Sequence, residues 1–100
     1  MHWQVYIILC SDDSLYTGIT TDIKRRFAQH AAGTGAKYFR RCSPCRVVYS
    51  EVGHDRSSAS CREARIKKLN TENKRRLINS PDNQIKVMTD NADNVERFHV

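Results

Sequence analysis

Side chains near the N-terminus alternate with a period of two, which is the pattern of a β-strand with one buried face. In residues 3–9 one set of positions is wholly apolar, and Tyr6 belongs to the other set. Residues 11–14 are short and polar, as in a turn. The pattern therefore predicts a hairpin whose second strand covers residues 14–20.

The register of this hairpin follows from its apolar residues. Leu9 and Leu15 share the core face only if they pair directly, which requires a three-residue loop or a bulge. That pairing puts Tyr6 and Tyr16 together on the opposite face, with Gly18 beside them. The pattern predicts two phenols on one side of a hairpin. Taken alone, it also fits two core tyrosines with hydrogen-bonded hydroxyls.

The next segment has apolar residues at helical spacing and a capping residue before them. Thr21 or Asp22 can cap a helix over roughly residues 22–32, and a glycine-rich stretch ends it. Arg26 and His30 are four residues apart, so they share one edge of the buried stripe. That stripe is predicted to consist of Ile23, Phe27 and Ala31.

The second half of the chain predicts a third strand and two further helices. Residues 36–41 form a basic segment that suits a short helix, and residues 46–52 are expected to be a strand. A second main helix is predicted over about 57–70, and a short helix over 72–79. The residues expected to be buried are Val47, Val48, Tyr49 and Val52 in the strand and Ala59, Ile66 and Leu69 in the longer helix.

Glu63 is unusual because it lies on the apolar face of the second main helix. It comes four residues after Ala59 and three before Ile66, whereas the neighbouring basic residues mostly lie on other faces. An inward carboxylate is costly unless a cation or hydrogen-bond donors meet it. The residue is therefore either a functional carboxylate or half of a structural salt bridge to an arginine, and the sequence leaves both open.

Length and composition predict one small domain without a membrane span. The chain has 100 residues and a net charge of +6, and its N-terminal apolar run is too short for a signal peptide, so we expect a cytoplasmic protein. Residues 22–79 hold fifteen Lys and Arg against five Asp and Glu, which suits a phosphate backbone or a solvated surface. We expect a domain over residues 1–80 and a polar, partly mobile tail over 81–100.

The four cysteines, which we expect to be reduced, include a C-x-x-C motif at Cys42 and Cys45. Such a motif is typical of half a zinc site or of a redox pair. The chain offers no second pair, and the motif precedes a predicted strand instead of opening a helix. Loop thiols are therefore the favoured interpretation, with a metal or redox role as the alternative.

The order of these residues resembles the GIY-YIG nuclease family, whose two name motifs occupy consecutive strands. Tyr6 matches the tyrosine of the first motif, and Tyr16 and Gly18 match the two ends of the second. The likeness is to the small stand-alone bacterial members, the YhbQ-like group, and covers roughly residues 3–80. It implies an α+β fold with a small three-stranded antiparallel sheet flanked by helices, in the order β-β-α-(α)-β-α-α.

The resemblance also implies a reaction, metal-dependent hydrolysis of a DNA phosphodiester bond, and assigns residues to it. Glu63 would bind a single Mg²⁺ or Mn²⁺, and Arg26 would hold the scissile phosphate. Tyr6 would be the general base, which requires a nearby cation because a free phenol has a pKa of about 10. Tyr16 would bond the phosphate or the water, and His30 would relay a proton or contact the phosphate.

Nucleic acid, with DNA favoured over RNA, is the expected partner, and repair or recombination is the expected setting. The basic middle of the chain also fits a module that binds nucleic acid without cutting it, with bases stacked on Tyr38 and Phe39. A protein partner is left open, and no membrane partner is expected. The residues expected to contact nucleic acid are Gly18, Lys37, Tyr38, Arg40 and Arg41.

Overall fold

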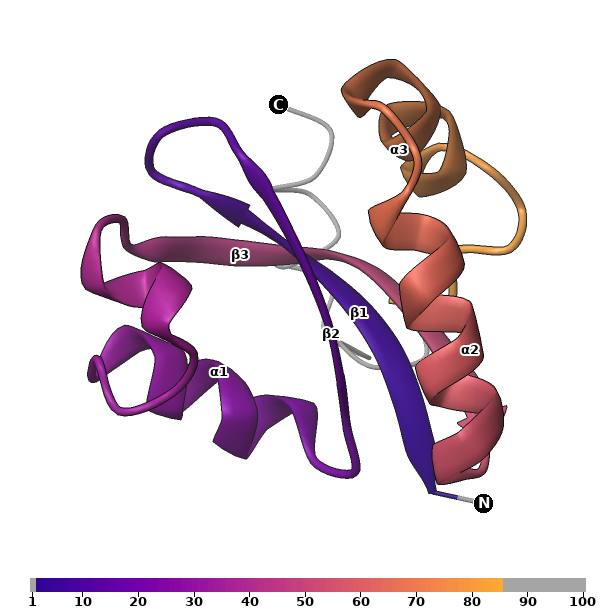
Figure 1. The fold of residues 1–100 in the computed structure, drawn as a ribbon, viewed down its shortest axis with the longest axis horizontal. Coiled ribbons are helices and arrows are strands. Elements are labelled where there is room, and N and C mark those ends of the chain that lie inside the picture. The colour runs from indigo at the N-terminus through magenta and orange to yellow at the C-terminus, as the bar shows by residue number, and fades with distance from the viewer. Residues whose placement is uncertain (1, 86–100) are drawn as a thin grey trace.

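Three strands form one antiparallel sheet in the order β2-β1-β3 in the computed structural model, which describes residues 2–85 (Figure 1). β1 spans Trp3–Cys10, β2 spans Leu15–Thr20 and β3 spans Pro44–His54. β1 is therefore the central strand, and β2 is an edge strand. The predicted α+β class and the predicted order of elements are confirmed.

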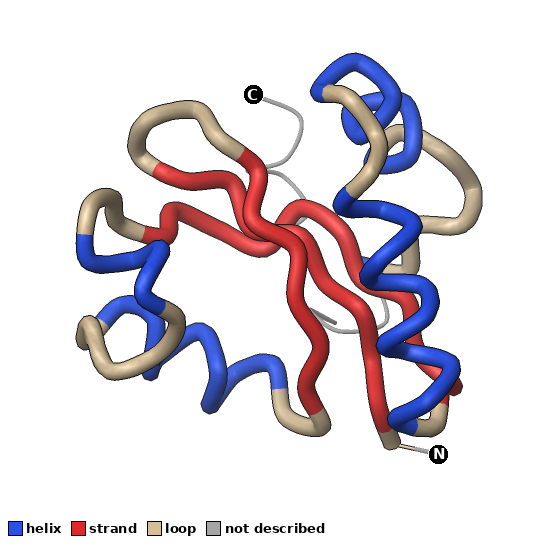
Figure 2. Tube along the Cα trace, viewed as in Figure 1, coloured by secondary structure: helices blue, strands red, loops and turns tan. Residues whose placement is uncertain are grey.

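Helices cover both faces of this sheet. One face carries α1 (Ile23–Ala31) and the short 3-10 helix η1 (Lys37–Arg40), and the other carries α2 (Arg56–Lys67) and α3 (Thr71–Ile78). From the shared viewpoint of Figures 1 and 2, β2 passes between α1 and α2, and both helices pack against the sheet from their own side (Figure 1, Figure 2). Side chains from both helices can therefore approach the same edge strand.

Each face of the sheet buries its own apolar cluster. The cluster under α2 contains Val5 and Ile7 of β1 together with Ala59 and Ile66 of the helix. The cluster under α1 is built around Tyr6 and extends to η1. Alternation along β1 sends successive side chains to the two clusters. The tyrosine face of the sheet is thus separate from the larger aliphatic core.

The hairpin has the predicted register. Leu9 lies opposite Leu15, and Tyr6 lies opposite Gly18. Residues 11–13 form the loop, and Asp13 ends it with φ of 69°, the left-handed conformation that a three-residue hairpin loop requires. Two phenols therefore lie on one side of the hairpin, as the apolar pattern indicates.

The helices begin at side chains that cap their first turns. Asp22, Asp55 and Asn70 each accept a hydrogen bond from the backbone N–H three residues later, at 3.1, 2.7 and 2.8 Å. α2 ends at Lys67, earlier than predicted, because Asn70 already starts α3. Within residues 2–85 there is no helix long and apolar enough to cross a bilayer.

Two residues that the sequence assigned to the core are exposed. Ala31 faces solvent, and His30 is buried in its place, because a position seven residues after Ile23 lies closer to the same helix face than one eight residues after. Val52 is 38% exposed. It lies where the pairing of β1 with β3 shifts register, so the alternation of buried and exposed positions breaks there.

After α3 the chain returns to β3. The side chain of Asn83 donates to the carbonyl of Val48 at 2.8 Å, and the Gln84 N–H donates to the carbonyl of Ser50 at 2.8 Å. Most of the predicted mobile tail lies at residues 86–100, outside the described part of the chain. The tail and the domain boundary that it implies stay predictions.

Candidate active site

The phenol ring of Tyr6 lies over Gly18 of the neighbouring strand. Tyr6 is only 1% exposed. A Cβ atom at Gly18 would come within 2.5 Å of Tyr6 Oη, which is closer than real Cβ contacts allow. The absence of a side chain at Gly18 is therefore what admits the buried phenol.

Tyr6 is hydrogen-bonded to His30 of α1. Tyr6 Oη and His30 Nε2 are 2.9 Å apart, and on the other side of the imidazole Nδ1 accepts the Ala36 N–H at 3.3 Å. Because Nδ1 is an acceptor, we assign the proton of the neutral ring to Nε2. His30 then donates to the phenol oxygen, and the proton of Tyr6 points away from the imidazole.

Burial keeps His30 neutral. The side chain is 1% exposed, and burial, together with the nearby charge of Arg26, lowers the pKa of His30 to about 4. The loop after α1 approaches the ring so closely that a Cβ atom at Gly35 would lie 2.2 Å from Nδ1. The sequence carries no signal for this contact, which depends on how the loop folds back.

Tyr16 belongs to a wall of aromatic rings on the same face. Its ring centroid lies 5.4 Å from that of His30, 4.8 Å from Phe39 and 5.2 Å from Tyr38. Phe39 is 6% exposed, so the prediction that bases stack on it is wrong. Tyr38 is 38% exposed, and its hydroxyl donates to Ser14 Oγ.

Both phenols are protonated at neutral pH. Burial raises the pKa of Tyr6 to about 12, with a further contribution from Tyr16, while Arg26 acts in the opposite direction. Burial also raises the pKa of Tyr16, against nearby cations. Arg26 itself is half-buried, and its Nη1 donates to Gln29 Oε1 at 3.0 Å.

A hollow of about 250 Å³ adjoins Arg26 between the end of β2 and the first turns of α1. Arg25, Arg26 and Gln29 line it on the helix side, and Trp3 lines it on the strand side. Guanidinium groups bind phosphate through paired N–H donors. A phosphate group in this hollow would therefore meet two guanidinium groups, and neither Tyr6 nor Tyr16 lines it.

Glu63 reaches the same region from α2, across the edge strand. Its side chain is 23% exposed and pairs with Lys67 Nζ at 3.4 Å, so the cation that meets it is a lysine and not an arginine. The charge of Glu63 acts to raise the pKa of both Tyr6 and Tyr16. The carboxylate is thus electrostatically coupled to the phenols although its helix covers the other face of the sheet.

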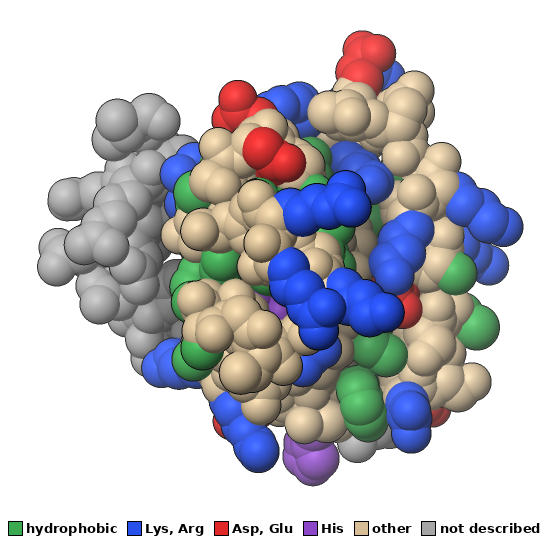
Figure 3. All heavy atoms as spheres, turned by 60° about the vertical axis from the view of Figure 1, so that its left-hand side comes forward, with side chains coloured by type: hydrophobic (Ala, Val, Ile, Leu, Met, Phe, Trp, Pro, Cys, Tyr) green, Lys and Arg blue, Asp and Glu red, His purple; other side chains and the backbone are tan. Residues whose placement is uncertain are grey.

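The predicted nucleic-acid contacts of η1 are accessible. Lys37, Arg40 and Arg41 are exposed together with Tyr38, and they lie on the face of the sheet that carries the phenols. Figure 3 shows Lys and Arg side chains gathered on the side of the molecule that α1 and η1 occupy. This surface is positively charged next to the tyrosines.

A second polar cluster lies around Glu51 of β3, and the sequence does not predict it. Its carboxylate accepts from Tyr49 Oη at 2.5 Å, from Arg62 Nε at 3.0 and 3.1 Å, and pairs with His54 Nε2 at 2.7 Å. The other nitrogen of His54 lies 2.8 Å from Ser58 Oγ. Burial opposes the charge of Glu51, but these bonds prevail and hold its pKa below the usual value. The cluster ties β3 to α2.

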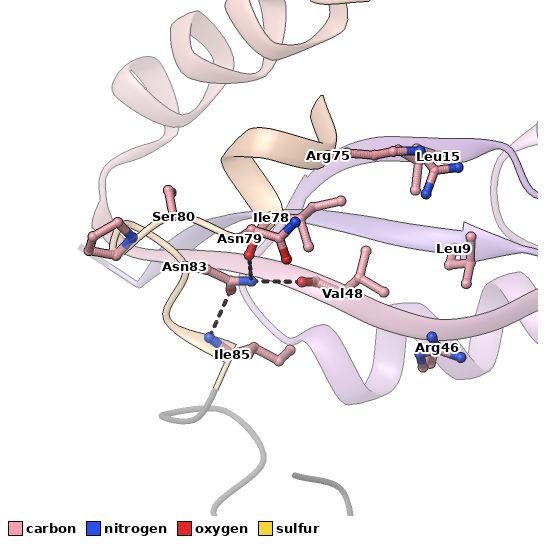
Figure 4. Close-up of a pocket in the computed structure, with 11 residues that line it drawn as sticks. Leu9, Leu15, Arg46, Val48, Arg75, Ile78, Asn79, Ser80, Asn83 and Ile85 are labelled. Atoms are coloured by element: carbon pink, nitrogen blue, oxygen red, sulfur yellow. Dashed lines mark hydrogen bonds between the residues drawn. The ribbon is translucent and has the colours of Figure 1, made fainter. Parts of the chain in front are cut away.

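Another hollow, of about 610 Å³, lies beside α3 and is separate from the tyrosines. Figure 4 shows Leu15 next to Arg75, with Leu9 and Val48 lower in the view. The amide of Asn83 bridges Val48 and the segment that leads out of the described residues. None of the residues that the sequence predicts for catalysis lines this hollow.

The sheet order, the paired tyrosines and the following arginine and histidine define the class of the protein. A sequence model of the GIY-YIG catalytic domain matches residues 2–76, and the chain belongs to this family of nucleases. Nucleases of the family act on nucleic acid and typically use a divalent metal.

Within the family, the chain is similar to UPF0213 proteins. One from Desulfotalea psychrophila is 47% identical over 81 residues, which cover 80% of this chain and 74% of that protein. One from Haloquadratum walsbyi is 51% identical over 73 residues, covering 73% and 82%. The UPF0213 protein YhbQ of Escherichia coli is 45% identical over 76 residues, covering 76% of each. Relatives thus occur in archaea as well as in bacteria.

A solved structure shares the fold. The solution NMR structure of a UPF0213 protein from Bacillus halodurans matches with a TM-score of 0.54 and 37% sequence identity. The match covers 89% of this chain and 95% of that one.

Proposed function

We propose that this protein is a divalent-metal-dependent endonuclease that hydrolyses phosphodiester bonds at the site formed by Tyr6, Tyr16, Arg26, His30 and Glu63. The observation that carries the proposal is the hydrogen bond between Tyr6 and His30, 2.9 Å long and buried at the base of a basic surface. A tyrosine that only packs in the core does not need a histidine partner whose pKa is strongly lowered. Perturbed ionisable groups that face one another are typical of catalytic sites.

Tyr6 is the general base of the proposed reaction. His30 donates to its oxygen and so stabilises a phenolate, but does not take its proton, because Nδ1 of His30 is already an acceptor. This assignment replaces a proton relay with a positioning role for His30. The pKa of Tyr6, about 12 in the free protein, has to fall so that the phenol loses its proton to solvent, and the resulting phenolate can then accept a proton from the attacking water.

Glu63 is the proposed metal ligand. Among residues 2–85 its carboxylate is not part of any group of three converging acidic, cysteine or histidine ligand atoms. One carboxylate, with water and phosphate oxygens completing the shell, suits Mg²⁺ or Mn²⁺ better than metals that need several protein ligands. The ion pair with Lys67 is partly exposed and therefore costs little to exchange. A bound divalent cation supplies positive charge that offsets Glu63 and favours the phenolate.

Arg26 and Tyr16 are proposed to hold the scissile phosphate. Arg26 lines the hollow between β2 and α1 and lowers the pKa of both phenols, and its guanidinium would offset charge that builds up in the transition state. Lys37, Tyr38, Arg40 and Arg41 would contact the strand further along, and Gly18 leaves room for Tyr6. DNA as the substrate, and repair or recombination as its setting, extend this proposal from the reaction of the family.

The test is cleavage of end-labelled single-stranded, duplex and branched DNA and RNA, with Mg²⁺, Mn²⁺ or EDTA. Glu63→Ala is compared with Glu72→Ala, because Glu72 forms an equivalent i,i+4 ion pair, with Arg76, on an exposed helix face. We expect metal-dependent products that disappear in Glu63→Ala and persist in Glu72→Ala. Cleavage by Glu63→Ala at the wild-type rate would refute the assignment of the metal ligand.

A non-cleaving nucleic-acid-binding module is the second candidate. The exposed residues of η1 favour it, since three cations surround an accessible tyrosine ring that can stack on a base. This function predicts binding that weakens steeply with salt and leaves the nucleic acid intact with every metal. Binding of that kind without products would decide in its favour.

A further inference from the structure

Three potential metal ligands from separate segments meet at the far end of the hairpin. Cys10 ends β1, Asp12 lies in the hairpin loop, and Cys42 lies between η1 and β3. One ligand atom from each, two Sγ and a carboxylate oxygen, all lie within 4.8 Å of one another. This is the one such group of three among residues 2–85, and it does not include Glu63.

Backbone pairing brings these residues together. Cys10 pairs with Pro44 across the sheet, and the Ser11 N–H donates to the Ser43 carbonyl at 2.9 Å. The Ser43 N–H in turn donates to Ser11 Oγ at 3.0 Å. The second cysteine of the C-x-x-C motif, Cys45, is exposed one position further along β3 and stays outside the group. Of the two cysteines in the motif, only Cys42 belongs to the group, where it lies near Cys10, which is 32 residues earlier in the chain.

The side chains are weakly occupied by other contacts and partly preorganised. Cys10 Sγ lies 3.7 Å from the Ile8 carbonyl and Cys42 Sγ lies 3.8 Å from that of Tyr38, which are long, weak thiol contacts. Asp12 Oδ1 accepts from the Ser14 N–H at 3.0 Å and from the Ser14 hydroxyl at 2.5 Å. Such outer partners are what orients a ligating carboxylate.

We propose that Cys10, Asp12 and Cys42 form a binding site for a thiophilic divalent cation, Zn²⁺ in the first place, with water as the fourth ligand. A tetrahedral zinc with Zn–S bonds of about 2.3 Å needs its sulfurs about 3.8 Å apart, so the observed group must contract by at most about 1 Å. Rotation about the side-chain bonds supplies a movement of that size. The site differs from Glu63 because thiolates select soft metals, whereas a lone carboxylate suits hard ones.

The charges around the site balance on metal binding. Two thiolates and one carboxylate carry three negative charges against the two positive charges of the cation. Lys37 and Arg41 line the same hollow, of about 390 Å³, and offset the remaining negative charge. Each thiol releases one proton as its sulfur binds. Metal affinity therefore rises with pH.

A bound metal would link the hairpin loop to η1. Asp12 bonds Ser14, Ser14 accepts from the Tyr38 hydroxyl, and the Tyr38 ring lies 5.2 Å from Tyr16. The cation would therefore hold the aromatic wall beside the phenols in place. This inference does not depend on the proposed nuclease function, because it rests on a different set of ligands.

The test is a titration of the reduced full-length chain with Co²⁺, whose thiolate complexes absorb strongly in the near ultraviolet, followed by displacement with Zn²⁺. We expect one Co²⁺ per chain, and loss of the absorption band in Cys42→Ser, whose side chain is only partly buried. Cys45→Ser and Cys61→Ser are the matched controls and keep the band, since both residues are exposed thiols. Ser14→Ala, which removes an outer partner of Asp12, is expected to weaken binding about 10- to 100-fold.

Circular dichroism and a thiol count confirm that each variant is folded and reduced before metal is added. Glu63→Ala is expected to keep the full cobalt band, which separates this site from the proposed catalytic one. A band that persists in Cys42→Ser, or one that Cys45→Ser removes, would overturn the proposal. So would the absence of any thiolate band in the wild-type protein, including a result in which the only cobalt bound is lost in Glu63→Ala.

Discussion

The Tyr6 cluster and the Glu51 cluster contain similar residues but satisfy their hydrogen bonds to different extents. Around Glu51, a tyrosine, an arginine and a histidine all turn toward one carboxylate. In the other cluster His30 donates to Tyr6, and the phenol proton has no acceptor among residues 2–85. In the Glu51 cluster every polar side chain has a partner within the cluster. In the Tyr6 cluster the phenol proton is left without one.

The two clusters also differ in electrostatics. Glu51 is charged because its hydrogen-bond and ion-pair partners lower its pKa more than burial raises it. The network therefore stabilises the fold with this carboxylate ionised. Tyr6 is neutral because burial outweighs the opposing effect of Arg26, and His30 is neutral because burial and the charge of Arg26 both lower its pKa. In the proposed reaction a bound cation would lower the pKa of Tyr6, so a pair that is neutral in the free protein suits catalysis better than stabilisation.

The largest effect that separates the clusters is expected from removing each phenolic hydroxyl. Tyr6→Phe should slow cleavage about 10²- to 10⁴-fold, which is the usual contribution of general-base catalysis. It also leaves the His30 N–H without its acceptor, so the free energy of unfolding should fall by about 1–3 kcal/mol. Single-turnover cleavage and urea unfolding measure the two effects separately.

Tyr49→Phe is the matched control, because Tyr49 is as buried a residue as Tyr6 and its hydroxyl is bonded to Glu51. It should cost stability to a similar degree and leave the cleavage rate of the folded protein unchanged. An equal loss of cleavage in both variants would show that the hydroxyl of Tyr6 acts through stability and not through chemistry.

The second effect is one of stability alone. Glu51→Gln leaves Arg62 and His54 without the carboxylate that they share, and both are only partly exposed. We expect the free energy of unfolding to fall by about 2 kcal/mol, a value reduced for this partial exposure. Glu72→Gln breaks a fully solvated pair and should leave the urea midpoint unchanged. A loss of cleavage in folded Glu51→Gln would mean that the two clusters are not independent.

The sequence predicts the arrangement of the two phenols but not the cluster around Glu51. The register of the hairpin follows from Leu9 and Leu15, so the common face of the two phenols could be predicted from local alternation. Glu51 shows no such pattern, because its partners come from β3 and α2 and meet only after the sheet has formed. His30 is buried in place of Ala31 because the buried face of α1 is displaced by one residue from the face that the sequence predicts.

The matching of Cys10 with Cys42 could not be predicted for a related reason. The pairing of β1 with β3 contains register shifts, and one of them falls between Leu9 and Cys10. Alternation within each strand carries no information about such shifts. The C-x-x-C spacing instead drew attention to Cys45, which the strand carries away from the group.

A third, smaller effect is expected at Gly18. In Gly18→Ala the new methyl group meets Tyr6 Oη, so the ring must move off its place. Overpacking of this kind typically costs about 1–3 kcal/mol, and cleavage should fall with it because the phenol is displaced. Gly53→Ala is the control: its φ of 84° makes alanine costly by about 1–2 kcal/mol, but its Cβ meets no atom within 4 Å. An unchanged cleavage rate in Gly18→Ala would show that cleavage does not depend on the position of the Tyr6 ring.

The last effect is a pH dependence that His30 contributes to stability. Its pKa is about 4 in the folded protein, below the ordinary value of 6.5 that applies to the unfolded chain. Between these values the unfolded chain binds more protons than the folded one, so stability rises with pH across this window and is lost as pH falls through it. His30→Gln keeps a donor and an acceptor but does not titrate, so its urea midpoint should change less between pH 6.5 and 4 than that of the wild type. Parallel curves for the two proteins would mean that His30 is charged in the fold, and Tyr6 would then have a cation and not a neutral donor as its partner.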